Sequence, residues 1–310
     1  MATGGGKKAI VAALVANLGI AIAKFVGFLI TGASSLIAES VHSLADSGNQ
    51  GLLLFGASRS KRAPTRIHPF GFARARYLWA FVVAIVLFAL GSLFSIYEGV
   101  HKLAHPEPLK SPRVAVIILV VGIVLETFSL RTAVVESNHV RGEQSWWQFV
   151  RHAKIPELPV VLLEDIGAMI GLVLALGGVL LAGATGDPNW DAYGTLSIGA
   201  LLGVIAVFLA MEMQSLLLGE GATDAHVTSI RSAIEGQPEV RRLIMLKTQH
   251  LGPEELLVVA KVELDPGLQF ADVVAVIDRA EQQVRTAVPA ATEMYIEPDY
   301  PMNAPSSAEA

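Results

Sequence analysis

The apolar residues of this chain fall into six long runs that are separated by shorter polar segments. Each run is about 20 residues or longer, which is the length that an α-helix needs to cross the hydrocarbon core of a bilayer. The pattern therefore predicts six transmembrane helices. They are expected at about 9–30, 35–56, 78–100, 114–135, 158–181 and 192–218.

Beyond Gly219 the long apolar runs give way to short alternating patterns in a more charged sequence. The elements expected there are a helix, two strands, a second helix and a third strand, at 225–235, 241–248, 256–264, 270–288 and 292–296. Short strands interrupted by two helices favour an open-faced α+β sandwich with both helices on one side of the sheet. We expect a six-helix transmembrane domain (1–219), a cytoplasmic ferredoxin-like or metallochaperone-like αββαβ domain (220–300) and a disordered tail (301–310).

Composition and charge support an integral membrane protein and indicate its orientation. The chain is 53% hydrophobic and 16% charged, with a mean hydropathy of +0.53, which is too apolar for an ordinary soluble domain. The segment 59–76 holds six basic and no acidic residues, and basic residues also gather at the amino terminus and in 136–157. Because such segments stay on the cytoplasmic side, we expect both termini in the cytoplasm. The expected location is a bacterial plasma (inner) membrane.

Four polar side chains interrupt the second predicted helix, namely Glu39, His42, Asp46 and Asn49. Their spacing of three, four and three residues places them along one helical stripe. A charged group at membrane depth costs roughly 2.5–3.5 kcal/mol on insertion scales, so such groups normally face a bundle interior or an aqueous cavity. The stripe therefore indicates a site.

A second pair of acidic residues, Glu164 and Asp165, interrupts the fifth predicted helix. Crossing of the second and fifth helices would bring one imidazole and several carboxylates together. One nitrogen with several oxygens suits Zn²⁺, Co²⁺, Fe²⁺ or Mn²⁺, and does not suit Cu(I). The chain has no cysteine, so any metal chemistry falls to His, Asp and Glu.

Three functions are compatible with such a cluster. In secondary transport, the metal displaces protons from His42 and the carboxylates. In an intramembrane metal-dependent hydrolase, the same cluster would activate water, although the sequence contains no HExxH motif. In a metal-sensing scaffold, the αββαβ domain would recruit a partner. A purely structural hydrogen-bonded pair of His42 and Asp46 is the fourth interpretation.

Two segments resemble motifs of the cation diffusion facilitator family: residues 38–46 (AESVHSLAD) and residues 68–74 (HPFGFAR). The six expected spans and the small αββαβ domain follow in the order found in that family, so the resemblance covers most of the chain. Residues 48–50 (GNQ) and 163–167 (LEDIG) are similar to the branch that includes zinc transporter nine of animals.

The resemblance implies a homodimeric exporter of divalent metal, driven by proton counter-flow, with a tetrahedral site between the second and fifth helices. Family members commonly place an Asp or His and an Asp four residues apart on each helix. His42 and Asp46 match the first pair, whereas the second pair retains Asp165 and has Val161 at the other position. Glu164 is the candidate replacement, and it lies about 100° round the helix from Asp165.

The resulting expectations can be stated together. Zn²⁺ is the first candidate substrate, with Mn²⁺, Fe²⁺ or Co²⁺ as the alternative. The expected partners are the metal ion, protons, the lipid bilayer and a second copy of the chain. We expect no enzymatic activity, no resident cofactor and no nucleic-acid partner. The expected metal ligands are His42, Asp46, Asp165 and Glu164, the possible pathway-lining residues are Glu39 and Asn49, and a possible loop site is His68, where Phe72 replaces a second His of the family.

Overall fold

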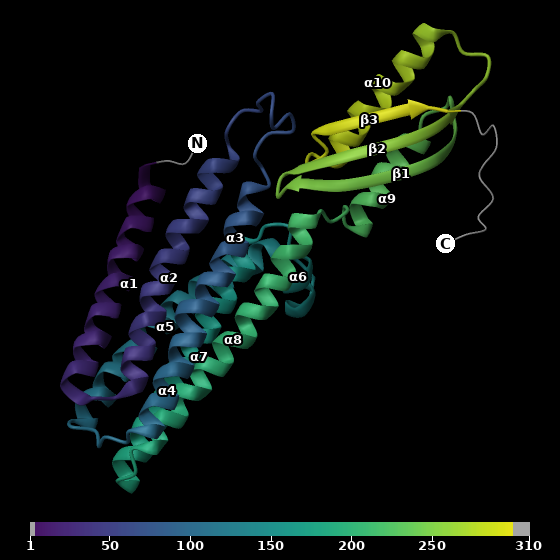
Figure 1. Cartoon of the computed structure of the whole chain (residues 1–310). Coiled ribbons are helices and arrows are strands. Elements are labelled where there is room, and N and C mark those ends of the chain that lie inside the picture. Colours follow the sequence, from purple (N-terminus) through teal and green to yellow (C-terminus); the bar gives the residue numbers. More distant parts are fainter. Residues whose placement is uncertain (1–3, 300–310) are drawn as a thin grey trace, which may run out of the picture. The chain divides into compact units, whose positions relative to one another are not determined.

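The computed structural model describes the backbone of residues 4–299 and the side chains of residues 17–299 (Figure 1). The disordered tail expected at 301–310 lies outside the described residues. The chain divides into two compact units, one made of Met1–Lys61 and Ala75–Gln214 and the other of Arg62–Arg74 and Ser215–Ala310. The basic segment that the sequence assigned to a loop of the transmembrane domain is thus largely part of the second unit.

The first unit is built from six long helices (Figure 1). They are α1 (Gly4–Thr31), α2 (Ser34–Ser60), a continuous helix made of α3 (Ala75–Val86), the π-helix η1 (Leu87–Leu93) and α4 (Phe94–Ala104), α5 (Pro112–Arg141), α7 (Glu157–Thr185) and α8 (Asn189–Leu218). At 1.5 Å per residue each is about 40 Å long, which exceeds the hydrocarbon thickness of a bilayer. The membrane-helical fold class is therefore confirmed.

Four of these helices, within the residues that the structure describes, are both long and apolar enough to cross a membrane: Ala75–Ala104, α5, α7 and α8. The part of α1 with described side chains, Asn17–Thr31, forms a shorter apolar helix. In α2 the polar stripe lowers the mean hydropathy. The count of six spans therefore stays a prediction.

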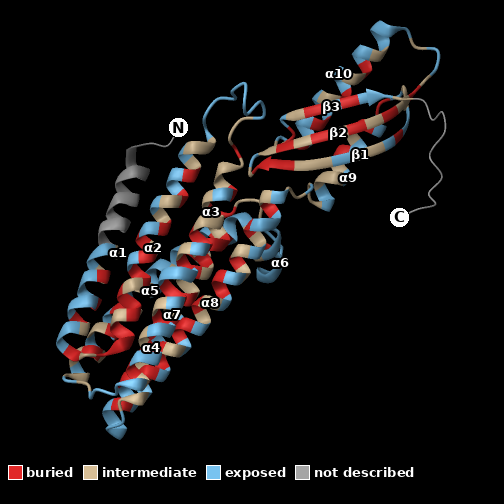
Figure 2. Cartoon of the chain, in the orientation of Figure 1, coloured by how far each residue is buried: buried red, intermediate tan, exposed pale blue. Residues whose placement is uncertain are grey.

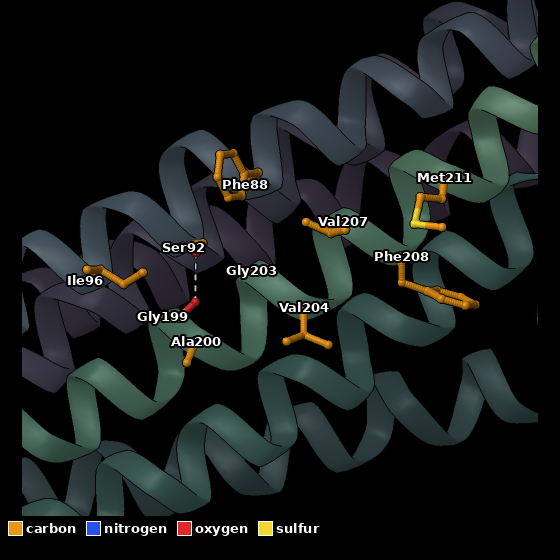
Figure 3. A pocket seen from close by; sticks show the side chains of 10 residues that line it. All are labelled: Phe88, Ser92, Ile96, Gly199, Ala200, Gly203, Val204, Val207, Phe208 and Met211. Carbon is orange, nitrogen blue, oxygen red and sulfur yellow. Dashed lines mark hydrogen bonds between the residues drawn. The ribbon is translucent and has the colours of Figure 1, made fainter.

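The π-helical turn η1 is a feature that the hydrophobic pattern did not predict, because it inserts a residue without interrupting the apolar run. Around it, the third long helix packs closely on α8 (Figure 3). The Ser92 hydroxyl donates to the Gly199 carbonyl over 2.8 Å, and a Cβ at Gly199 would lie 2.9 Å from the Ile96 nitrogen. Small residues let the two backbones approach, as is usual where membrane helices pack. An apolar groove lined by both helices runs beside this contact (Figure 3).

The amino-terminal end of α2 is capped by a side chain from another helix. Its own N-cap residue, Ala33, offers no side-chain acceptor. Instead, Asp191 in the first turn of α8 accepts bonds from the Ser34 N–H (2.7 Å) and hydroxyl (2.9 Å) and from the Ser35 hydroxyl (2.5 Å). The helix start has unpaired N–H groups and a partial positive charge, so a buried carboxylate stabilises it. This contact fixes where α2, and hence its polar stripe, begins.

A short helix, α6 (Trp146–His152), lies within the basic segment 136–157. A capping box between Ser145 and Gln148 starts this helix. The Arg151 guanidinium lies 5.7 Å from the centroid of the Trp147 ring. Aromatic rings beside basic groups are typical of the membrane–water interface.

The second unit contains α9 (Asp224–Glu235), β1 (Val240–Gly252), β2 (Glu255–Leu264), α10 (Phe270–Ala287) and β3 (Glu293–Pro298), which confirms the expected αββαβ order. In the sheet, β2 is central, antiparallel to β1 and parallel to β3. Alternate residues of β2 are buried (Figure 2). They form one core with Ile230 and Ile234 of α9 and with Val276 and Val284 of α10, as the period-two pattern of a half-buried strand requires.

Candidate metal pathway

The polar stripe of α2 lies inside the helix bundle. Glu39, His42 and Asn49 are buried, and Asp46 is largely buried. His42 Nε2 and Asp46 Oδ2 are 3.6 Å apart, and neither ring nitrogen of His42 has a hydrogen-bond partner among the described residues. Because buried polar groups are normally hydrogen-bonded, an unpartnered imidazole beside a carboxylate calls for an explanation such as a ligand.

The stripe is matched on the opposite helix by Glu164 of α7. Glu164 is buried, and its Oε1 accepts a hydrogen bond of 2.6 Å from the Asn49 amide nitrogen. This bond joins α2 to α7, so the crossing of these two helices that the sequence predicted is present. Glu164 and Asn49 therefore lie together at the contact between α2 and α7.

Asp165 points to a different helix, because one residue further along α7 turns the side chain by about 100°. Its Oδ2 accepts a hydrogen bond of 3.0 Å from the Ser129 hydroxyl of α5. Asp165 still lies near enough to His42 and Asp46 to interact with them electrostatically. Glu164 and Asp165 thus lie near the His42–Asp46 pair, with Glu164 bonded to α2 and Asp165 bonded to α5.

Two of the four candidate ligands are held by separate partners, Glu164 by Asn49 and Asp165 by Ser129. Within the described part of the chain, no three or more His, Asp and Glu side chains are grouped as the ligands of a metal ion. Each of these carboxylates has a second oxygen that can bind metal, but binding of one ion by all four side chains would require them to draw closer together than they are here. The ligand set therefore stays a prediction.

Glu126 is a further acidic residue near this region that the motifs of the sequence did not single out. It lies near the middle of both the expected helix (114–135) and α5. It is partly buried and interacts electrostatically with Asp165 and Asp46. The sequence signal that could have identified Glu126 is that it is a single carboxylate within a long apolar run.

Lys24 of α1 is a second charged group beside the stripe. It is buried, and its ammonium donates to Glu39 Oε2 and to the Ser43 hydroxyl, each over 2.9 Å. Lys24 therefore pairs within the bundle. Glu39, its acidic partner, lies about one helical turn from His42 on α2.

His68 lies in a turn and Val161 in an apolar cluster, and the possible loop site at His68 stays a prediction. His68 is exposed in the segment Arg62–Arg74, its ring centroid lies 4.6 Å from that of Phe72, and its carbonyl accepts the N–H of Gly71, which has a φ of 77°. These contacts describe a tight turn. Val161 packs against the apolar cluster of Ala133, Phe149 and Leu162.

Bundle, stripe and αββαβ unit together have the architecture of a membrane protein that handles cations. Residues 10–218 match the cation efflux transmembrane domain, and residues 222–299 match the cytoplasmic domain of cation efflux proteins. The chain therefore belongs to the cation efflux, or cation diffusion facilitator, family, as the sequence motifs indicated.

Several relatives are similar over most of this chain. The human protein named proton-coupled zinc antiporter SLC30A9, mitochondrial, is 34% identical over 244 residues, which are 78% of this chain and 43% of the relative. Metal tolerance protein C4 of Arabidopsis thaliana is 28% identical over 261 residues, or 84% of this chain and 57% of the relative. Cation-efflux pump FieF of Pectobacterium atrosepticum is 27% identical over 286 residues, or 91% and 89%. This chain spans about half the length of the first two relatives.

Proposed function

We propose that this protein is a secondary transporter that exports a divalent metal cation from the cytoplasm in exchange for protons, with Zn²⁺ as its first substrate. The observation that carries the proposal is the buried stripe of α2, in which His42 and Asp46 adjoin one another and α7 supplies Glu164. The names of the zinc antiporter and of the cation-efflux pump support the same activity.

The proposed exchange follows from the chemistry of the candidate ligands. An imidazole binds metal only when it is neutral, and a carboxylate binds best when it is ionised, so metal binding displaces protons from His42, Asp46 and the acidic pair of α7. Protons arriving from the other side would displace the metal in turn. One imidazole with three carboxylates can close a tetrahedron around Zn²⁺, whereas Mn²⁺, Fe²⁺ or Co²⁺ would accept the same oxygens at higher coordination number.

Orientation and membrane form a second part of the proposal. The basic residues of 59–76 and 136–157 support a cytoplasmic location for these segments and, if all six helices cross, for both termini. The relatives include a protein named as mitochondrial and a bacterial pump, so the bacterial plasma membrane stays a prediction. A homodimer is proposed on the match to the family's cytoplasmic domain.

A flux measurement tests the proposal. Purified protein is reconstituted in liposomes, a pH gradient is imposed, and movement of Zn²⁺, Mn²⁺, Fe²⁺ and Co²⁺ is compared with that in empty vesicles. We expect protein-dependent movement that grows with the pH gradient and is largest for Zn²⁺. Movement no faster than in empty vesicles for all four ions would end the transporter proposal.

A further inference from the structure

Lys24 is an unusual residue because its charge is buried at membrane depth. Its ammonium reaches Glu39 of α2 as well as the Ser43 hydroxyl, with both distances at 2.9 Å, and the Glu39 side chain is fully buried. Charges at this depth are expensive, and those that persist are normally paired and functional. Lys24 thus delivers a fixed positive charge to the polar stripe.

Glu39 is only half engaged by this contact. Its Oε2 is taken by Lys24, whereas its Oε1 has no hydrogen-bond partner among the described residues. A Cβ added at Gly171 of α7 would come within 2.7 Å of that oxygen, so the missing side chain at Gly171 gives the carboxylate its room. Glu39, which belongs to α2, therefore contacts α1 and faces α7, the helix that carries Glu164 and Asp165.

We propose that Lys24 is a tethered cation that withholds Glu39 from the transported metal and thereby limits how tightly the stripe holds that metal. His42 is three residues from Glu39, and side chains at that spacing are neighbours on a helix. Without the ammonium, Glu39 is free to become an additional oxygen ligand. With the ammonium in place, a divalent ion bound at His42 and Asp46 has one carboxylate ligand fewer and is repelled by a nearby positive charge. Lys24 is a positioning residue that favours release of the metal over its retention. The expected effect on transport rests on the proposed function, whereas the expected effect on binding does not.

The decisive variant is Lys24→Met, which keeps the length and apolar stem and removes the charge. We expect the Kd for Zn²⁺, measured on detergent-purified full-length protein by competition with a chromophoric chelator, to fall by about tenfold, a typical size for coupling between sites. In liposomes, kcat should fall together with KM, because release becomes slow. Lys24→Arg, which preserves the charge, should leave both values near those of the parent.

A second substitution separates this role from simple packing. In Lys24→Met combined with Glu39→Gln, the freed carboxylate is gone, so the Kd should return toward that of the parent. Glu39→Gln alone completes the double-mutant cycle, so that the effect of Lys24→Met on the Kd can be compared with and without the Glu39 carboxylate. The matched control is Lys102→Met, since Lys102 is also buried but donates to the Gly32 carbonyl, away from the stripe.

The proposal is overturned if Lys24→Met weakens Zn²⁺ binding, or if it changes the Kd equally with and without Glu39. Should Lys24→Met not fold, Lys24→Leu replaces it, because its side chain has neither a charge nor a donor that could hold Glu39. The same tightening is then expected, and an unchanged or higher Kd contradicts the proposal. A parent that binds Zn²⁺ but moves none would contradict the transport function and leave the binding comparison valid.

Discussion

At the scale of single residues, His42 and Asp46 carry the strongest expectation. His42 Nε2 and Asp46 Oδ2 lie 3.6 Å apart, and the buried imidazole makes no hydrogen bond with any residue that the structure describes. We predict that His42→Ala and Asp46→Ala each reduce proton-driven Zn²⁺ flux to the level of empty vesicles while folded protein remains in the membrane. Glu136→Ala, which removes an exposed carboxylate of α5, is the control and should transport normally. Normal flux in Asp46→Ala would mean that the stripe is structural.

Glu164 is the residue whose role most affects metal choice. If it is a ligand, Glu164→Ala should lower transport of every ion, because one oxygen is lost. Glu164→His should shift preference toward Zn²⁺ over Mn²⁺, because imidazole suits the softer ion. A metal-competition flux assay measures both effects. Parent-like behaviour of both variants would place Glu164 outside the coordination sphere, leaving His42, Asp46 and Asp165.

Helical spacing alone identified which side chains of α2 share a stripe, and burial bears this out for Glu39, His42 and Asn49. It did not identify their partners. Lys24 meets Glu39 from another helix, and Ser129 meets Asp165 from a third, because such contacts depend on how helices cross. A single sequence does not show how its helices cross.

At the scale of elements, the cap of α2 by Asp191 makes a testable stability prediction. Asp191→Ala leaves the buried donors of Ser34 and Ser35 without their acceptor, and each orphaned donor costs about 1–3 kcal/mol. We expect a clear fall in the thermal stability of the detergent-solubilised protein. The control is Asp187→Ala, an exposed carboxylate with one local bond to the Asn189 N–H. Equal effects of the two variants would show that the cap contributes little.

The close approach of α8 to the third long helix gives a second prediction at this scale. Gly199→Ala would place a methyl group 2.9 Å from the Ile96 nitrogen and 3.1 Å from the Ser92 carbonyl oxygen, both of which are backbone atoms. Because backbone cannot move aside cheaply, we expect destabilisation of about 1–3 kcal/mol. Gly177→Ala in α7, where a Cβ meets nothing within 4 Å, should be neutral or slightly stabilising. Thermal unfolding of both variants in detergent compares them.

Element types were predictable because each long apolar run and each alternating run has its own period, and the observed bounds differ from the expected ones by a few residues in most elements. Two features were not predictable. The π-helix η1 leaves the apolar run intact, and the longer course of α5 past residue 135 includes polar positions that read as a loop. Neither feature changes the hydrophobic period from which the element types were predicted.

At the scale of the whole molecule, the second unit leads to a prediction about assembly. Its αββαβ fold has one hydrophobic core, built on one face of a three-stranded sheet, and a domain of about 80 residues buries a modest share of its surface. Pairing of two copies would bury more, and the match to the family's cytoplasmic domain favours it. We predict that light scattering of the detergent-solubilised full-length protein, corrected for bound detergent, gives the mass of two chains. The control measurement covers a wide range of protein concentration, because a dimer that forms by chance contact would dissociate on dilution. A single-chain mass throughout that range would contradict the homodimer, and transport would then have to be explained within one copy of the helix bundle.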